Sequence, residues 1–167
     1  MCADRAATIL ARFNAAHNEL VWKLRDCAFA AGAEGQRREG WNAAQIGWHV
    51  AVTNDFIASV LTGEKALAQP APAEFKESLD TRALAAQADP SEVPQPPSVV
   101  GLDSAIERLR ASAHHVSKAI AALSPERGTG YCVAMPFGTL SLYELADFGA
   151  AHVIHHSAEV ARALAGA

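Results

Sequence analysis

Three histidines in this chain have the residue type and the spacing that metal chemistry needs. His152 and His156 stand four residues apart in Ala-His-Val-Ile-His-His-Ser-Ala-Glu, and His49 lies in Gln-Ile-Gly-Trp-His-Val-Ala. Because four residues make about one helical turn, the paired imidazoles project from one face of a helix. Imidazole is a common ligand of zinc, nickel and iron, and three protein ligands leave room for water or substrate. The three residues therefore predict a metal site, provided that a second helix brings His49 to the pair.

Each of these histidines also has a purely structural interpretation. A single histidine on an apolar stripe, such as His49, is more often a core residue hydrogen-bonded to a neighbour. Two buried imidazoles one turn apart, such as His152 and His156, are costly unless their nitrogens find partners, and a metal supplies one for each. Since helix bundles build metal sites from facing helices, three histidines on two apolar stripes favour ligation.

The other reactive residues form no motif of a known catalytic class. Cys2, Cys27 and Cys132 are widely separated, so they indicate neither a disulfide framework nor a Cys-x-x-Cys site. No histidine has a glutamate three positions before it, as di-iron carboxylate bundles require. The sequence also lacks His-Glu-x-x-His, a glycine-rich phosphate loop and Gly-x-Ser-x-Gly.

Apolar residues spaced three and four apart predict four long helices, and frequent alanine favours the same conformation. His49 falls on the apolar stripe of the second helix. His152 and His156 fall on that of the fourth. The expected helices cover residues 4–31, 42–63, 102–123 and 141 onward.

Capping residues mark the beginnings of two of these helices. Asn42 with Gln45 predicts a capping box at the start of the second helix, and Gly63 closes that helix. Ser141 with Glu144 predicts a second capping box at the start of the fourth.

The connections between the expected helices differ in length. Residues 64–101 form a long, proline-rich link in which a short helix is expected at about 73–87. Such a link can cross a whole bundle, so the second and third helices can run parallel. Residues 124–140 are expected to form a loop. We expect one closed bundle without a β-sheet, in a single domain over residues 1–167.

The composition excludes several partners. The formal net charge is −4 and no basic cluster exceeds Arg37-Arg38, which argues against nucleic-acid binding. No apolar run approaches the ~20 residues that a membrane-spanning helix needs. The N-terminus lacks a signal-peptide core, so a cytoplasmic location is expected.

The whole pattern resembles a known family. Pro-Phe-Gly-Thr-Leu-Ser-Leu-Tyr-Glu-Leu, which leads into the His152 to His156 pair, and a capped helix with a central histidine are similar to the DinB/YfiT-like four-helix-bundle superfamily. The resemblance covers nearly the whole chain. It implies an all-α, up-down-down-up bundle, often dimeric, with a divalent metal on His49, His152 and His156. Zinc or nickel is the first expectation for the metal, and iron or manganese is the alternative.

One position departs from that family pattern. Many relatives carry glutamine three residues after the last histidine, where this chain has Glu159. A carboxylate there could orient an imidazole, act as an extra ligand or serve as a base. The alternative is a solvated charge near the end of the helix.

The resemblance implies three candidate functions. The first is a metal-dependent thiol S-transferase-like enzyme, in which the metal activates a small-molecule thiol to attack an electrophile. The second is a non-catalytic, stress-related metal-binding module. The third is a metal-assisted hydrolase with Glu159 as base. A homodimer is expected in each case.

Overall fold

Four long helices form the body of the protein. The computed structural model describes residues 2–27, 40–77, 80–87 and 93–165. The helices in the bundle are α1 (Cys2–Cys27), α2 (Ala43–Thr62), α4 (Leu102–Ala121) and α6 (Leu142–Ala165).

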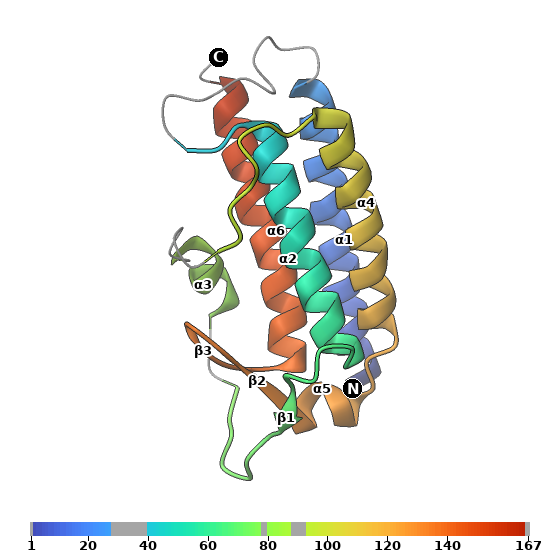
Figure 1. The fold of residues 1–167 in the computed structure, drawn as a ribbon. Helices are drawn as coiled ribbons and strands as arrows, with labels where there is room; N and C mark the ends of the chain where they lie inside the picture. The colour runs from blue at the N-terminus through green and yellow to red at the C-terminus, as the bar shows by residue number, and fades with distance from the viewer. Residues whose placement is uncertain (1, 28–39, 78–79, 88–92, 166–167) are drawn as a thin grey trace.

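The helices run up, down, down and up. In Figure 1, α1 rises from the N-terminus, α2 and α4 descend side by side, and α6 rises to the C-terminus. Both α1 and α2 pack against α4 and α6, so the four helices enclose one core. The crossover between α2 and α4 makes these two neighbours parallel. The all-α bundle and its topology are as the sequence predicted.

The predicted apolar stripes face inward. Phe13, Leu20 and Leu24 of α1 are fully buried, as are Leu109 and Ile120 of α4. Burial of each such side chain contributes roughly 1.5–3 kcal/mol, so this shared core, more than helix propensity, holds the helices together.

Both predicted capping boxes are present. At the start of α2, the Gln45 backbone N–H donates to Asn42 Oδ1 at 2.8 Å, and the Asn42 N–H donates to Gln45 Oε1 at 3.0 Å. Before α6, the Ser141 N–H donates to Glu144 Oε2 at 2.9 Å and the Glu144 N–H donates to Ser141 Oγ at 3.0 Å. Gly63 ends α2 with a φ of 83°, which glycine adopts at little cost.

The expected helix boundaries hold only in part. Helix α3 covers Thr81–Gln87, and residues 73–77 of the helix expected over 73–87 form turns and irregular structure. Residues 28–31 of the expected first helix lie outside the described residues. Within residues 124–140, which were expected to form a loop, Pro125 begins the short helix α5 (Pro125–Gly130), because the first turn of a helix needs no proline N–H.

The expectation of no β-sheet was wrong. Strands β1 (Gln69–Pro70), β2 (Tyr131–Met135) and β3 (Gly138–Ser141) form a small antiparallel sheet in the order β1-β2-β3. It lies at the end of the bundle where α6 begins (Figure 1). Residues 124–140 are therefore a helix and a hairpin rather than a loop, and Cys132 is a buried strand residue.

Polar contacts fasten the crossover to the bundle. Asp147 on α6 accepts from Arg12 at 2.6 Å and from the Thr81 hydroxyl of α3 at 2.6 Å. Further along, Gln45 Nε2 donates to the Pro97 carbonyl at 2.9 Å. These contacts hold the link against α6 at one point and against α2 at another.

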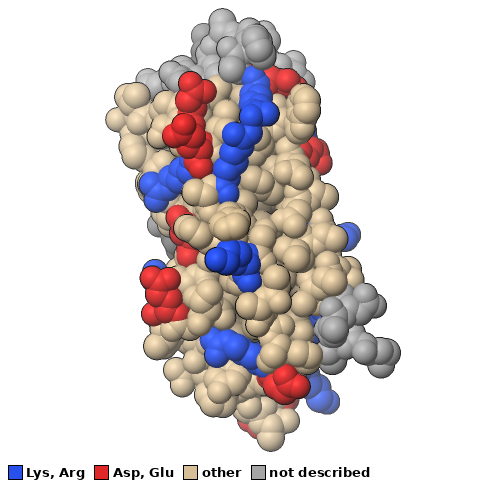
Figure 2. All heavy atoms as spheres, turned by 90° about the vertical axis from the view of Figure 1, so that its right-hand side faces the viewer, with Lys and Arg blue, Asp and Glu red and all other residues tan. Residues whose placement is uncertain are grey.

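The face built from α4 and α1 carries basic and acidic side chains beside one another (Figure 2). Among the described residues, no helix combines the length and apolarity needed to cross a membrane.

Candidate metal centre

The structure brings the three predicted histidines together inside the bundle. His49 Nε2 lies 3.1 Å from His152 Nε2, and His156 Nε2 lies 3.1 Å from the same atom. All three residues are buried, with exposures of 2%, 3% and 8% for His49, His152 and His156. Helix α2 supplies the first imidazole, and one face of α6 supplies the other two.

This spacing fits a divalent metal. Zinc–nitrogen bonds of about 2.0–2.1 Å at angles between octahedral and tetrahedral place ligand nitrogens about 2.8–3.4 Å apart. The two measured separations of 3.1 Å fall within that interval. Among the described residues, no cysteine, carboxylate or fourth histidine joins this group. The cluster could therefore hold a metal through three imidazoles and leave other coordination positions to small molecules.

Two of the three rings have acceptors that select the required tautomer. His49 Nδ1 donates to the Pro94 carbonyl at 3.2 Å, and His156 Nδ1 donates to Glu159 Oε2 at 2.5 Å. Because a proton on Nδ1 leaves a lone pair on Nε2, both rings present their lone pairs to the shared point. His152 Nδ1 is buried without a hydrogen-bond partner in the described part of the chain.

Burial keeps the central rings neutral, as metal ligation requires. Loss of solvent, followed by repulsion from His156, lowers the pKa of His49 to about 4. Loss of solvent, followed by repulsion from His156 and then from His49, lowers the pKa of His152 well below its usual value. The hydrogen bond from His156 lowers the pKa of Glu159, so this carboxylate is charged at neutral pH.

Glu159 also forms part of a second, more exposed group. Its Oε1 lies 3.6 Å from His155 Nε2, while Oε2 receives the His156 hydrogen bond. His155, His156 and Glu159 are close enough to share an ion. However, His156 Nδ1 is already committed to Glu159, so this geometry supports a carboxylate that orients His156.

A large cavity reaches one residue of the cluster. Its volume is about 1530 Å³, and it follows the outer face of α2 between α4 on one side and α3, the hairpin and α6 on the other. Of the three histidines in the cluster, His152 lines this cavity. Pro94 of the link lines it as well, so the segment that orients His49 also forms part of the cavity wall.

Several neighbours of the cluster were not predicted from the sequence. The Trp41 ring lies 4.7 Å from the His49 ring, and the Phe148 ring lies 5.8 Å from that of His152, measured between centroids. Trp41 immediately precedes the N-cap Asn42, a position typical of a helix-start anchor, so its local signal indicated packing rather than a place beside the cluster. No local pattern pointed to the Pro94 carbonyl, because a backbone acceptor carries no residue-type signature.

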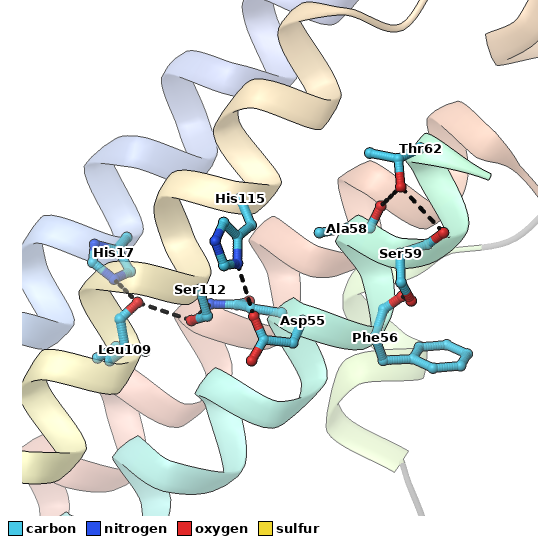
Figure 3. Close-up of polar contacts among 10 residues, drawn as sticks. His17, Asp55, Phe56, Ala58, Ser59, Thr62, Leu109, Ser112 and His115 are labelled. Atoms are coloured by element: carbon cyan, nitrogen blue, oxygen red, sulfur yellow. Dashed lines mark hydrogen bonds and ion pairs between the residues drawn. The ribbon is translucent and has the colours of Figure 1, made fainter. Parts of the chain in front are cut away.

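The remaining histidines lie elsewhere. His17 is buried and its Nε2 lies 3.1 Å from the Leu109 carbonyl, in the interior rather than in the cluster. His115 pairs with Asp55 at 3.2 Å on the α4 side of α2. Figure 3 shows both contacts.

The chain was also compared with known proteins. A family model described as the DinB superfamily matches residues 6–160. No curated protein and no solved structure matches the chain.

Proposed function

Because the chain belongs to the DinB superfamily, we propose that it is a metal-dependent enzyme of the thiol S-transferase type. A divalent metal would be held by His49, His152 and His156. The substrates would be a low-molecular-weight thiol and a small electrophile. Zinc or nickel suits three neutral imidazoles best, and iron or manganese is the alternative.

One observation carries the proposal: the three imidazole nitrogens converge, and one of the three residues, His152, lines a large cavity. A structural metal is usually enclosed by four protein ligands, whereas a catalytic metal keeps a position open. Here the described residues supply three ligands, and His152 lines a cavity with room for substrates. An accessible position favours the enzyme over the non-catalytic metal-binding module.

When bound, a divalent metal would lower the pKa of a coordinated thiol and supply a thiolate near neutral pH. In the overall reaction a sulfur–carbon bond forms, the leaving group departs with its electron pair, and the thiol proton passes to solvent. The protein contributes orientation. The Pro94 carbonyl and the Glu159 carboxylate hold two of the imidazoles in the productive tautomer.

The cavity wall contributes a second effect. Phe148 packs beside His152 and Phe137 packs beside Phe148, with ring centroids 5.8 Å and 5.1 Å apart. An apolar wall excludes water from the reacting groups and strengthens electrostatic interactions there. The hydrolase alternative needs Glu159 as a base, but its carboxylate lies at Nδ1 of His156, on the side of the ring away from the cluster.

The test combines metal analysis with an activity screen. Untagged protein should contain about one zinc or nickel per chain. The loaded protein should transfer at least one of several low-molecular-weight thiols to a chromogenic electrophile. His152→Ala should lose both the metal and the transfer. The matched control is His114→Ala, which removes an exposed histidine on α4 and should change neither.

Two results would contradict this function. Metal-loaded protein that transfers no thiol, with a metal whose coordination shell holds no exchangeable position, would promote the non-catalytic module. Transfer that survives in His152→Ala would place the reaction away from the cluster.

A further inference from the structure

The cavity has an apolar stretch next to the cluster. Phe56 on α2, Phe137 of the hairpin and Phe148 on α6 all line it, together with Met135. They come from α2, the hairpin and α6, and Phe56, Met135 and Phe137 are only half-buried. Aromatic walls that remain partly open in the free protein offer contact area to an apolar ligand.

The cationic group of Lys65 lies at the end of this stretch. Its Nζ lies 5.0 Å from the centre of the Phe56 ring. Figure 3 shows the Phe56 ring extending away from α4, on the opposite side of α2 from the Asp55–His115 pair. Phe56 follows His49 by seven residues, so the two lie on one face of α2 about 10 Å apart along its axis.

Lys65 has no anionic partner in the described part of the chain. Its backbone N–H donates to the Ser59 carbonyl at 2.9 Å, which fixes where its side chain starts. None of the ion pairs among the described residues involves its ammonium. The C-terminal end of α2 carries partial negative charge and attracts the Lys65 ammonium. This attraction alone does not explain why the ammonium lies over the Phe56 ring in the cavity wall.

Among the charged residues that line the cavity, the cations outnumber the carboxylates. Lys118 and Arg127 add two cations, while Asp55 and Glu64 are the carboxylates. Asp55 is already paired with His115. A ligand in the cavity therefore meets more cationic than anionic side chains along its lining.

We propose that the substrate of this site is an amphipathic anion. Its apolar or aromatic body would lie against Phe56, Phe137 and Phe148. Its anionic end group would contact the Lys65 ammonium, about two helical turns from His49. The identification of this molecule as a substrate rests on the proposed function, but its binding does not depend on turnover.

A pair of fluorescent probes tests the proposal on the whole chain after incubation with zinc. Anilinonaphthalene sulfonate is an anionic amphiphile, and phenylnaphthylamine is the same molecule without the sulfonate. Lys65→Met should weaken binding of the sulfonate about two- to fivefold, as expected for an exposed ion pair. It should leave the neutral probe unchanged. Lys65→Glu should weaken the sulfonate further, because it adds repulsion.

Two control variants complete the design. Lys76→Met makes the same change in net charge at an exposed position outside the cavity lining, and it should leave both probes unchanged. Phe56→Ala should weaken both probes, because both share the apolar body. Circular dichroism checks that every variant is folded.

The proposal would be overturned if Lys65→Met and Lys76→Met weakened binding of the sulfonate probe equally. It would also be overturned if Lys65→Met weakened binding of both probes to the same extent, or if Phe56→Ala changed binding of neither probe. Metal content is measured on the same samples. Protein that shows the charge selectivity but binds no metal would therefore overturn the proposed function and leave this inference standing.

Discussion

At the residue scale, the three histidines are not equivalent. His49 is oriented by a neutral backbone carbonyl and His156 by a charged carboxylate. His152 has no such partner in the described part of the chain, and it is the one that lines the cavity. Because a charged acceptor raises the basicity of the imidazole that donates to it, His156 should be the strongest of the three ligands.

The role of Glu159 can be measured as metal affinity. We expect Glu159→Ala to weaken zinc binding about 10- to 100-fold, the usual effect of losing the group that orients a ligand. Glu159→Gln should lie between that variant and the wild type, because its amide oxygen can still accept from His156 Nδ1 but carries no charge. Competition with a chromophoric chelator gives the dissociation constants.

Glu107→Gln provides the control for this comparison. Glu107 is exposed on α4, and the substitution makes the same change in charge away from the cluster. If Glu159→Ala binds zinc as tightly as Glu107→Gln does, then Glu159 is a solvated charge with no part in the site.

At the element scale, the short helix α5 and the hairpin after it determine how α6 enters the bundle. Gly128 of α5 packs against Tyr143 at the start of α6. A Cβ at Gly128 would lie 2.4 Å from Cε2 of the Tyr143 ring, which is closer than real contacts allow. Tyr143 is fully buried and cannot move into solvent.

Gly128→Ala should therefore destabilise the protein by about 1–3 kcal/mol, the usual cost of overpacking. Gly130→Ala is the matched control within the same helix, because its added Cβ would meet no atom within 4 Å. Urea denaturation measures both free energies of unfolding. Equal stabilities for the two variants would show that α5 can shift away from α6 without cost.

At the scale of the whole molecule, the apolar core is continuous without the histidine cluster. One set of buried apolar side chains links the four helices, and none of the three histidines belongs to it. We expect protein treated with a chelator to keep its helical signal at room temperature and to lose only a few degrees of melting temperature. His152→Ala should behave similarly. Loss of the helical signal on chelation would favour the structural role of the metal.

Stability of the metal-free protein should fall as the pH decreases from 7.5 to 5.5. His17, His49 and His152 have lowered pKa values in the folded state, chiefly because burial disfavours their charged forms. Below their ordinary value of 6.5, the unfolded chain binds protons that the folded chain does not. Each of these groups then lowers the free energy of unfolding by up to about 1.4 kcal/mol for each pH unit.

Urea denaturation in the presence of a chelator measures this pH dependence. His17→Gln removes one of the three groups and keeps a side-chain donor for the Leu109 carbonyl, so its stability should depend less steeply on pH. A wild-type stability that does not change between pH 7.5 and 5.5 would show that these rings are not held neutral.

The expected homodimer remains a prediction. Trp22 on α1 is 67% exposed and Ile154 on α6 is 44% exposed, and these two helices are neighbours. Lys23, next to Trp22, donates to Ser157 Oγ at 3.0 Å, so α1 and α6 are in contact near both positions. Trp22→Glu should shift a dimer toward monomer in sedimentation velocity at micromolar concentration. A wild type that sediments as monomer would contradict the dimer.

The sequence by itself determined the four helices and the faces that carry the histidines. Helix periodicity is local, since residues three and four apart must share a face, and capping boxes involve residues only three apart. For this reason the stripes that contain His49 and the His152–His156 pair could be identified without coordinates. The family motif then predicted how the helices are ordered in the bundle.

Only the tertiary structure decided what surrounds the histidines. The Pro94 carbonyl reaches His49 across 45 residues, and the hairpin brings Phe137 beside Phe148. Strands β2 and β3 are five and four residues long and lie among glycine and proline, so their local signal is that of a loop. Their pairing depends on contacts between distant segments, which residue spacing does not encode.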